Sequence, residues 1–174
     1  LFIMEEKLYD EEFVMKWPNL PYLGDTETKR FWRDQVSEDP DIPDIFMVWD
    51  EKSNQPKPME YPWNDELQPA LQGTYTYEGK TYKTGFQLLW EQVEQYTLEY
   101  AGWICELEPE RIEKAIRLYA QQTPSGIAIG VSTDQTPNSV QAAMSTATLD
   151  LLMGNVERPG ALLQRFRTSG VFDM

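Results

Sequence analysis

The chain has 174 residues, enough for one domain or for a piece of a larger one, and 41% of them are hydrophobic. A net charge of −14 and an isoelectric point near 4.3 argue against nucleic-acid binding, which needs a basic surface. Histidine is absent and cysteine occurs once, which excludes histidine triads, histidine metal ligands, disulfide frameworks and cysteine zinc sites within this chain.

The first residues, LFIMEEKLYDEEFVMKW, predict helical structure that Pro18 and Pro21 terminate. Because the chain opens directly in helix at Leu1, without a signal-peptide pattern, we expect it to be part of a longer protein. No apolar run approaches ~20 residues, so we expect no membrane span in this chain. The carboxylates of this region are interpreted as a solvated helix face: Glu5, Glu6, Asp10, Glu11 and Glu12.

The next part of the chain predicts a loop and hairpin excursion over residues 36–83. Before it, Phe31 and Trp32 indicate another short helix. Within it, the apolar run 45–49 is typical of a buried strand, and a turn and a proline-rich segment follow, up to Trp63. Alternating residues around Gly79 predict a β-hairpin over 74–83. We interpret the many aromatic residues here as the packing of this excursion and not as a binding platform.

Residues 84–160 predict a helix–strand–helix core. Thr84 is expected to cap a helix whose apolar residues share one face, and a second helix is expected from Tyr96–Thr97 to near Cys105, whose thiol should be buried and inert. Pro109 fits the first position of a third helix. The apolar face of the first helix comprises Phe86, Leu89, Trp90 and Val93, and the third helix carries the ion-pair candidates Glu110–Lys114 and Glu113–Arg117.

The run from Gly126 to Gly160 carries most of the functional information. An apolar strand over 127–131 is expected to end in a polar loop, after which Thr136 and Pro137 open a long helix that Gly154 ends. The expected buried face of this helix comprises Val140, Ala143, Met144, Ala147 and Leu151. Polar groups at the carboxyl end of a strand and beside a helix amino terminus are where open α/β sheets bind nucleotide-like ligands.

The loop residues Ser132, Thr133, Asp134 and Gln135 have no evident structural task once Thr136 caps the helix. A carboxylate such as that of Asp134 can accept two hydrogen bonds from a guanine or amino-pyrimidinone edge, and Gln135 offers both a donor and an acceptor. The helix amino terminus could hold a phosphate. From these residues alone, an ordinary polar loop with a good helix cap remains the preferred alternative.

Four segments occur in an order that resembles one enzyme family: LYDEEFVMKW, then PALQGTY followed by GFQLLWEQVEQYTLEYA, then residues 104–119, and finally LLMGNVERPG. Together they are similar to the molybdopterin oxidoreductases of the dimethyl sulfoxide reductase superfamily. The resemblance implies a single portion, residues 1–174, of a Rossmann-like layered α/β domain in a molybdenum or tungsten oxidoreductase. It implies bis-molybdopterin guanine dinucleotide as the cofactor, and an iron–sulfur cluster upstream of this chain.

In that family the strand-end loop approaches the pterin or the metal cavity, so the resemblance implies cofactor-binding roles for Ser132, Thr133, Asp134, Gln135 and Asn138. The metal ligand is expected outside this chain, which should be inactive alone. The expected partners are the remainder of the same polypeptide and an electron-transfer subunit. The alternative is a non-catalytic α/β interaction domain that keeps the fold without a cofactor.

Overall fold

The computed structural model describes residues 1–38, 44–60, 66–128, 130, 135–156 and 158–161. The described helices are α1 (Phe2–Glu5), α2 (Glu11–Lys16), α3 (Gly85–Val93), α4 (Leu98–Cys105), α5 (Pro109–Gln121) and α7 (Ser139–Leu152). The described strands are β1 (Leu23–Asp25), β2 (Arg33–Gln35), β3 (Ile45–Asp50), β4 (Gln55–Met59), β5 (Thr74–Tyr77) and β6 (Lys80–Thr84). The prediction of an α/β chain with several helices, few strands and a β-hairpin is confirmed.

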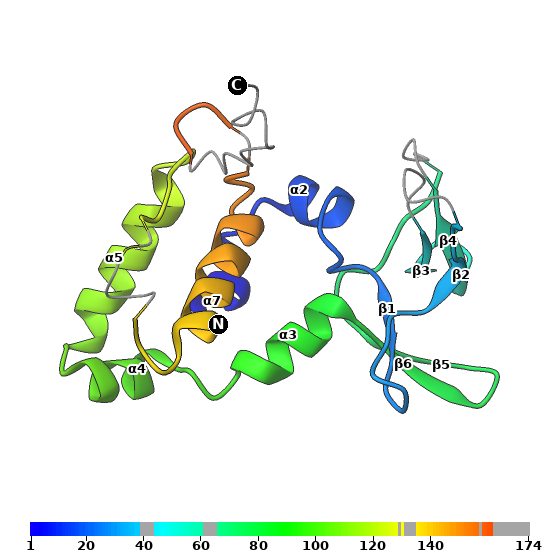
Figure 1. The fold of residues 1–174 in the computed structure, drawn as a ribbon, viewed down its shortest axis with the longest axis horizontal. Helices are drawn as coiled ribbons and strands as arrows, with labels where there is room; N and C mark the ends of the chain where they lie inside the picture. The colour runs from blue at the N-terminus through cyan, green and yellow to red at the C-terminus, as the bar shows by residue number, and fades with distance from the viewer. Residues whose placement is uncertain (39–43, 61–65, 129, 131–134, 157, 162–174) are drawn as a thin grey trace, which may run out of the picture.

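The elements fall into two lobes (Figure 1). Helices α1, α4, α5 and α7 form a helical lobe, the strands form a β lobe, and α2 and α3 lie between the two. The described strands pair antiparallel in two three-stranded sheets, with the orders β1-β6-β5 and β2-β3-β4. Strands β2, β3 and β4 are consecutive in the chain and β5 and β6 form a hairpin, whereas β1 pairs with β6 from a distant part of the sequence.

The β lobe is held together by aromatic side chains between its two sheets. Trp49 of β3 stacks on Tyr75 of β5 with ring centroids 4.4 Å apart, and Trp32 stacks on Tyr82 of β6 at 4.7 Å. Around them lies a buried cluster of Leu23, Met47, Trp49, Ala70 and Tyr82. These aromatic residues pack against one another, as the sequence predicted.

Two strand segments contradict the sequence-based expectations. The short helix at Phe31–Trp32 is wrong: Phe31 bridges Gly24, and the Trp32 N–H donates to the Leu23 carbonyl at 2.7 Å, so this backbone pairs with a strand. The proline-rich segment after the turn forms β4, with Pro56 opposite Trp49 in the β3 register. Prolines are tolerated there because β4 is at the edge of its sheet.

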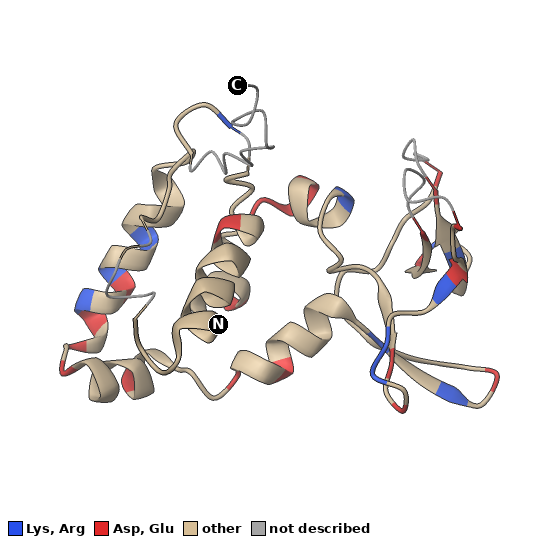
Figure 2. Cartoon of the chain, viewed as in Figure 1, with Lys and Arg blue, Asp and Glu red and all other residues tan. Residues whose placement is uncertain are grey.

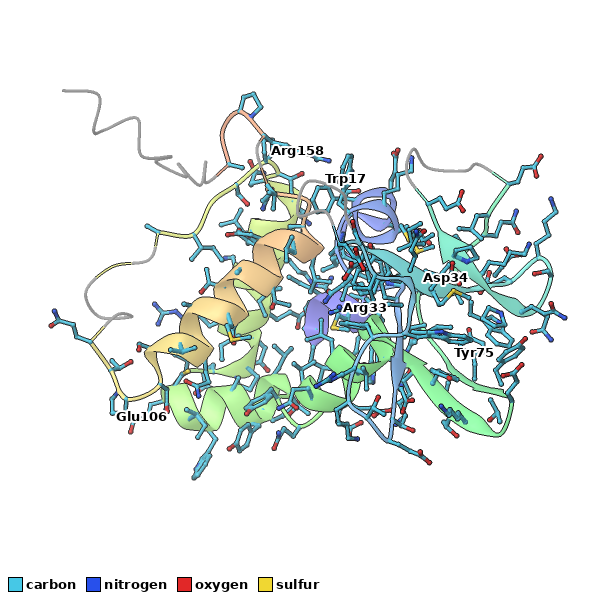
Figure 3. The ribbon with its side chains drawn as sticks, turned by 45° about the vertical axis from the view of Figure 1, so that its right-hand side comes forward. Trp17, Arg33, Asp34, Tyr75, Glu106 and Arg158 are labelled. Atoms are coloured by element: carbon cyan, nitrogen blue, oxygen red, sulfur yellow. The ribbon has the colours of Figure 1, made fainter. Side chains whose placement is uncertain are left out.

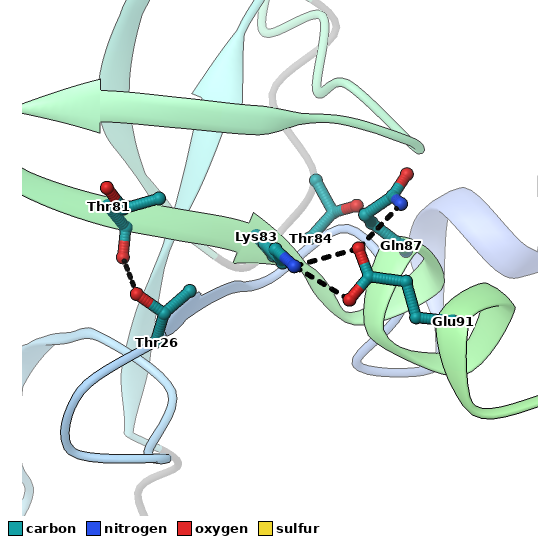
Figure 4. A network of polar contacts seen from close by, with 6 residues as sticks. All are labelled: Thr26, Thr81, Lys83, Thr84, Gln87 and Glu91. Carbon is teal, nitrogen blue, oxygen red and sulfur yellow. Dashed lines mark hydrogen bonds and ion pairs between the residues drawn. The ribbon is translucent and has the colours of Figure 1, made fainter.

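Helix α3 connects the lobes. Thr84 caps it by accepting a hydrogen bond from the Gln87 N–H at 3.1 Å, as predicted. Its apolar face packs in a cluster whose buried members come from α1, α2, the turn after α2, α3 and α7: Met4, Val14, Leu20, Phe86 and Leu152. Lys83 of β6 donates to both carboxylate oxygens of Glu91, at 2.7 and 2.8 Å, which ties α3 to the hairpin (Figure 4).

The helical lobe confirms the predicted helix starts. Thr97 caps α4 by accepting from the Tyr100 N–H at 3.2 Å, and Pro109 occupies the first turn of α5. Arg117 of α5 pairs with Glu113 at 2.7 Å, as predicted, and also with Glu6 beyond α1 at 3.1 Å. The guanidinium thereby joins the amino-terminal segment to α5.

Two burial predictions for this lobe are wrong. Cys105 is exposed, and the buried residue of α4 is Gly102, where a Cβ would lie 2.7 Å from the Leu107 carbonyl oxygen. Val140 and Met144 of α7 are each 65% exposed, whereas Asp150 and Leu152 are buried. Only the carboxyl-terminal part of α7 is packed tightly, because it lies against α2 and bonds to α5.

Candidate functional site

The predicted binding residues lie just before α7. Ser132, Thr133 and Asp134 are outside the described residues, so the structure does not place them. Gln135 and Asn138 are described, and both are exposed in the turn that leads into the helix. Their side chains are therefore open to solvent on the amino-terminal side of a 14-residue helix.

The start of α7 differs from the prediction. Asn138, not Thr136, is the N-cap residue, and its side chain makes no capping hydrogen bond. Thr136 instead closes a turn through its carbonyl, which accepts from the Ser139 N–H at 3.1 Å. The helix thus begins two residues later than expected, because that turn comes before the first helical residue. The side chain of Asn138 is therefore not used to cap α7.

The strand predicted over 127–131 is not found in its described residues. Ile127, Ala128 and Gly130 have no strand or helix assignment, and residues 129 and 131 lie outside the described part. The preceding turn is well anchored: the Ser125 N–H donates to the Asn155 side-chain oxygen at 3.2 Å. The chain therefore enters the candidate loop from a position fixed against the end of α7.

Asn155 is the centre of a buried polar network. Its side-chain amide donates to the Tyr119 hydroxyl at 3.0 Å and to the Ser125 hydroxyl at 3.1 Å. Tyr119 in turn donates to the buried carboxylate of Asp150 at 2.8 Å. Burial, followed by this hydrogen bond to Asp150, raises the pKa of Tyr119. The network joins α5, the turn at Ser125 and the end of α7, and Asn155 is only 1% exposed.

Sequence reasoning interpreted the Gly154–Asn155 turn mainly as a helix end, and it did not predict this network. One signal was present: Asp150 interrupts an apolar run, and a buried carboxylate requires a hydrogen-bond donor. Tyr119 supplies that donor from a helix 31 positions earlier in the chain. Such pairing across helices does not follow from local spacing.

Gly154 and Asp10 close the same end of α7. Gly154 has φ +62°, and a Cβ there would lie 2.8 Å from the Asp10 carboxylate, so both conformation and space favour glycine. Asp10 caps α2 through the Phe13 N–H at 3.0 Å and pairs with Arg158, also at 3.0 Å. The interpretation of Asp10 as part of a solvated helix face is therefore wrong, while Glu5, Glu6, Glu11 and Glu12 are exposed as predicted.

Other site classes find no support in the described part of the chain. Its residues include no group of three or more histidine, cysteine, aspartate or glutamate side chains that could hold a metal ion. Among the same residues, no helix has the length and apolarity to cross a bilayer.

Comparisons with known proteins support a family relationship. One subunit of the sulfite dehydrogenase of Allochromatium vinosum is 30% identical over 120 residues, covering 64% of this chain and 12% of that protein. The alpha subunit of the F420-dependent formate dehydrogenase of Methanocaldococcus jannaschii is 29% identical over 76 residues, 44% of this chain and 11% of that protein. The alpha subunit of the dimethylsulfide dehydrogenase of Rhodovulum sulfidophilum is 21% identical over 168 residues, 92% of this chain and 18% of that protein.

The chain therefore spans less than a fifth of the length of each of these relatives. No family model matches it. All three relatives are named as subunits of dehydrogenases, and the order of segments found in the sequence is consistent with their common family.

Proposed function

Because this chain is related to the molybdopterin oxidoreductases of the dimethyl sulfoxide reductase superfamily, we propose that it helps to bind a molybdopterin guanine dinucleotide in a larger enzyme. The similarity to three dehydrogenase subunits carries this proposal. The proposed binding residues are Ser132, Thr133, Asp134, Gln135 and Asn138. When bound, such a cofactor supplies the molybdenum or tungsten centre at which oxidation and reduction take place.

The described residues fit such a ligand at the turn before α7. Gln135 and Asn138 present amide groups to solvent, and the side chain of Asn138 is not used to cap the helix. An amide can donate and accept hydrogen bonds, as a pterin or guanine edge requires. The amino terminus of α7 also favours an anionic group, which matters in a chain with a net charge of −14.

The residues of this chain would bind and orient the cofactor. Asp134 would accept two hydrogen bonds from an amino-substituted ring, while Gln135 and Asn138 would bond its other polar atoms. The network around Asn155 would keep the entrance to this loop in place, since it fixes Ser125 against the end of α7. The metal ligand and the reacting groups would come from outside this chain.

The test uses the full-length enzyme carrying Asp134→Ala or the pair Gln135→Ala and Asn138→Ala. Each variant should bind less molybdenum or tungsten, measured by elemental analysis, and less pterin, measured by fluorescence after release. Each lost hydrogen bond to a bound ligand is worth about 0.5–1.5 kcal/mol, so a roughly 2- to 10-fold loss of occupancy at limiting cofactor is expected. Gln55→Ala, an exposed glutamine of β4, is the matched control and should retain wild-type occupancy.

Wild-type occupancy and turnover in both site variants would contradict the residue assignment. If the full-length protein itself contained neither metal nor pterin, the alternative of a non-catalytic α/β interaction domain would replace the cofactor role. The two outcomes are distinguishable, because the first retains a loaded enzyme and the second never has one.

A further inference from the structure

We draw no further inference here: the strongest candidate, the exposed aromatic patch of Tyr100 and Trp103 on α4, which ends at Glu106 (Figure 3), has acidic neighbours on α4 and basic ones on α5 (Figure 2), and nothing in the described residues shows what covers it.

Discussion

The two lobes differ in how they bury their apolar residues. The β lobe encloses its aromatic side chains between two small sheets, where Leu23 and Val48 are fully buried. In the helical lobe, α5 has no buried residue and α4 buries only Gly102. The core side chains of the β lobe are thus covered by the lobe itself. In the described part of the helical lobe, several large apolar side chains remain exposed to solvent. Most of the exposed large apolar side chains of the described residues accordingly lie on the helical lobe.

Two tryptophans provide the largest test of this difference. Trp49→Ala removes a ring that is 7% exposed and stacked on Tyr75, and it should lower the free energy of unfolding by about 3–5 kcal/mol. Trp103→Ala removes a ring that is 74% exposed and should change it by less than about 0.5 kcal/mol. Urea unfolding of the purified chain measures both. Equal losses would show that the lobes do not differ in this way.

The polar network at the end of α7 is the strongest candidate for local stabilisation in the helical lobe. Asn155→Ala would remove the hydrogen-bond partner of both the Ser125 N–H and the Ser125 hydroxyl. It should lower the free energy of unfolding by about 1–3 kcal/mol. It should also increase proteolytic cleavage in the segment 123–128. Gln141→Ala, at an exposed site on α7, is the control and should be nearly neutral. A neutral Asn155→Ala would mean that the network does not anchor this segment.

Asp50 provides a test of the β lobe by pH. The ammonium of Lys57 at 2.6 Å, followed by the Ser53 hydroxyl, holds the pKa of this buried carboxyl well below its usual range. Because the pKa is lower in the folded state, the ionised carboxylate stabilises the fold above about pH 4, and this stability is lost as the pH falls toward the folded-state pKa.

The unfolding midpoint of the wild type should therefore decrease as the pH is lowered from 6 to 3. It should decrease less steeply in Asp50→Asn, which starts from a lower stability because the ion pair with Lys57 is removed. Parallel pH dependences in the two proteins would assign the acid sensitivity to other carboxylates.

The sequence predicted the elements that depend on local chemistry. Thr84 and Thr97 cap their helices, Pro109 begins α5, and Gly79 turns the hairpin with φ +78°. Each of these effects involves residues only a few positions apart, so the local sequence contains the necessary information.

The predictions that failed concerned helix burial and strand pairing. Both depend on which distant residues pack against an element. The spacing of Val140 and Met144 predicted a buried face on α7, but both side chains are exposed in the described structure, whereas Asp150 is buried and bonded to Tyr119 of α5. Likewise, Pro56 did not prevent strand formation, because β4 is at an edge of its sheet. For the candidate site, sequence reasoning proposed the loop before α7, which stays a prediction, and it placed the helix start two residues too early.

The proposed role of this chain is to form part of the cofactor-binding region of a molybdenum or tungsten enzyme. The most direct measurement is the metal and pterin content of the full-length protein purified from its native host. We predict about one molybdenum or tungsten atom per protein molecule, together with releasable pterin guanine dinucleotide. A folded full-length protein with neither metal nor pterin would contradict the account.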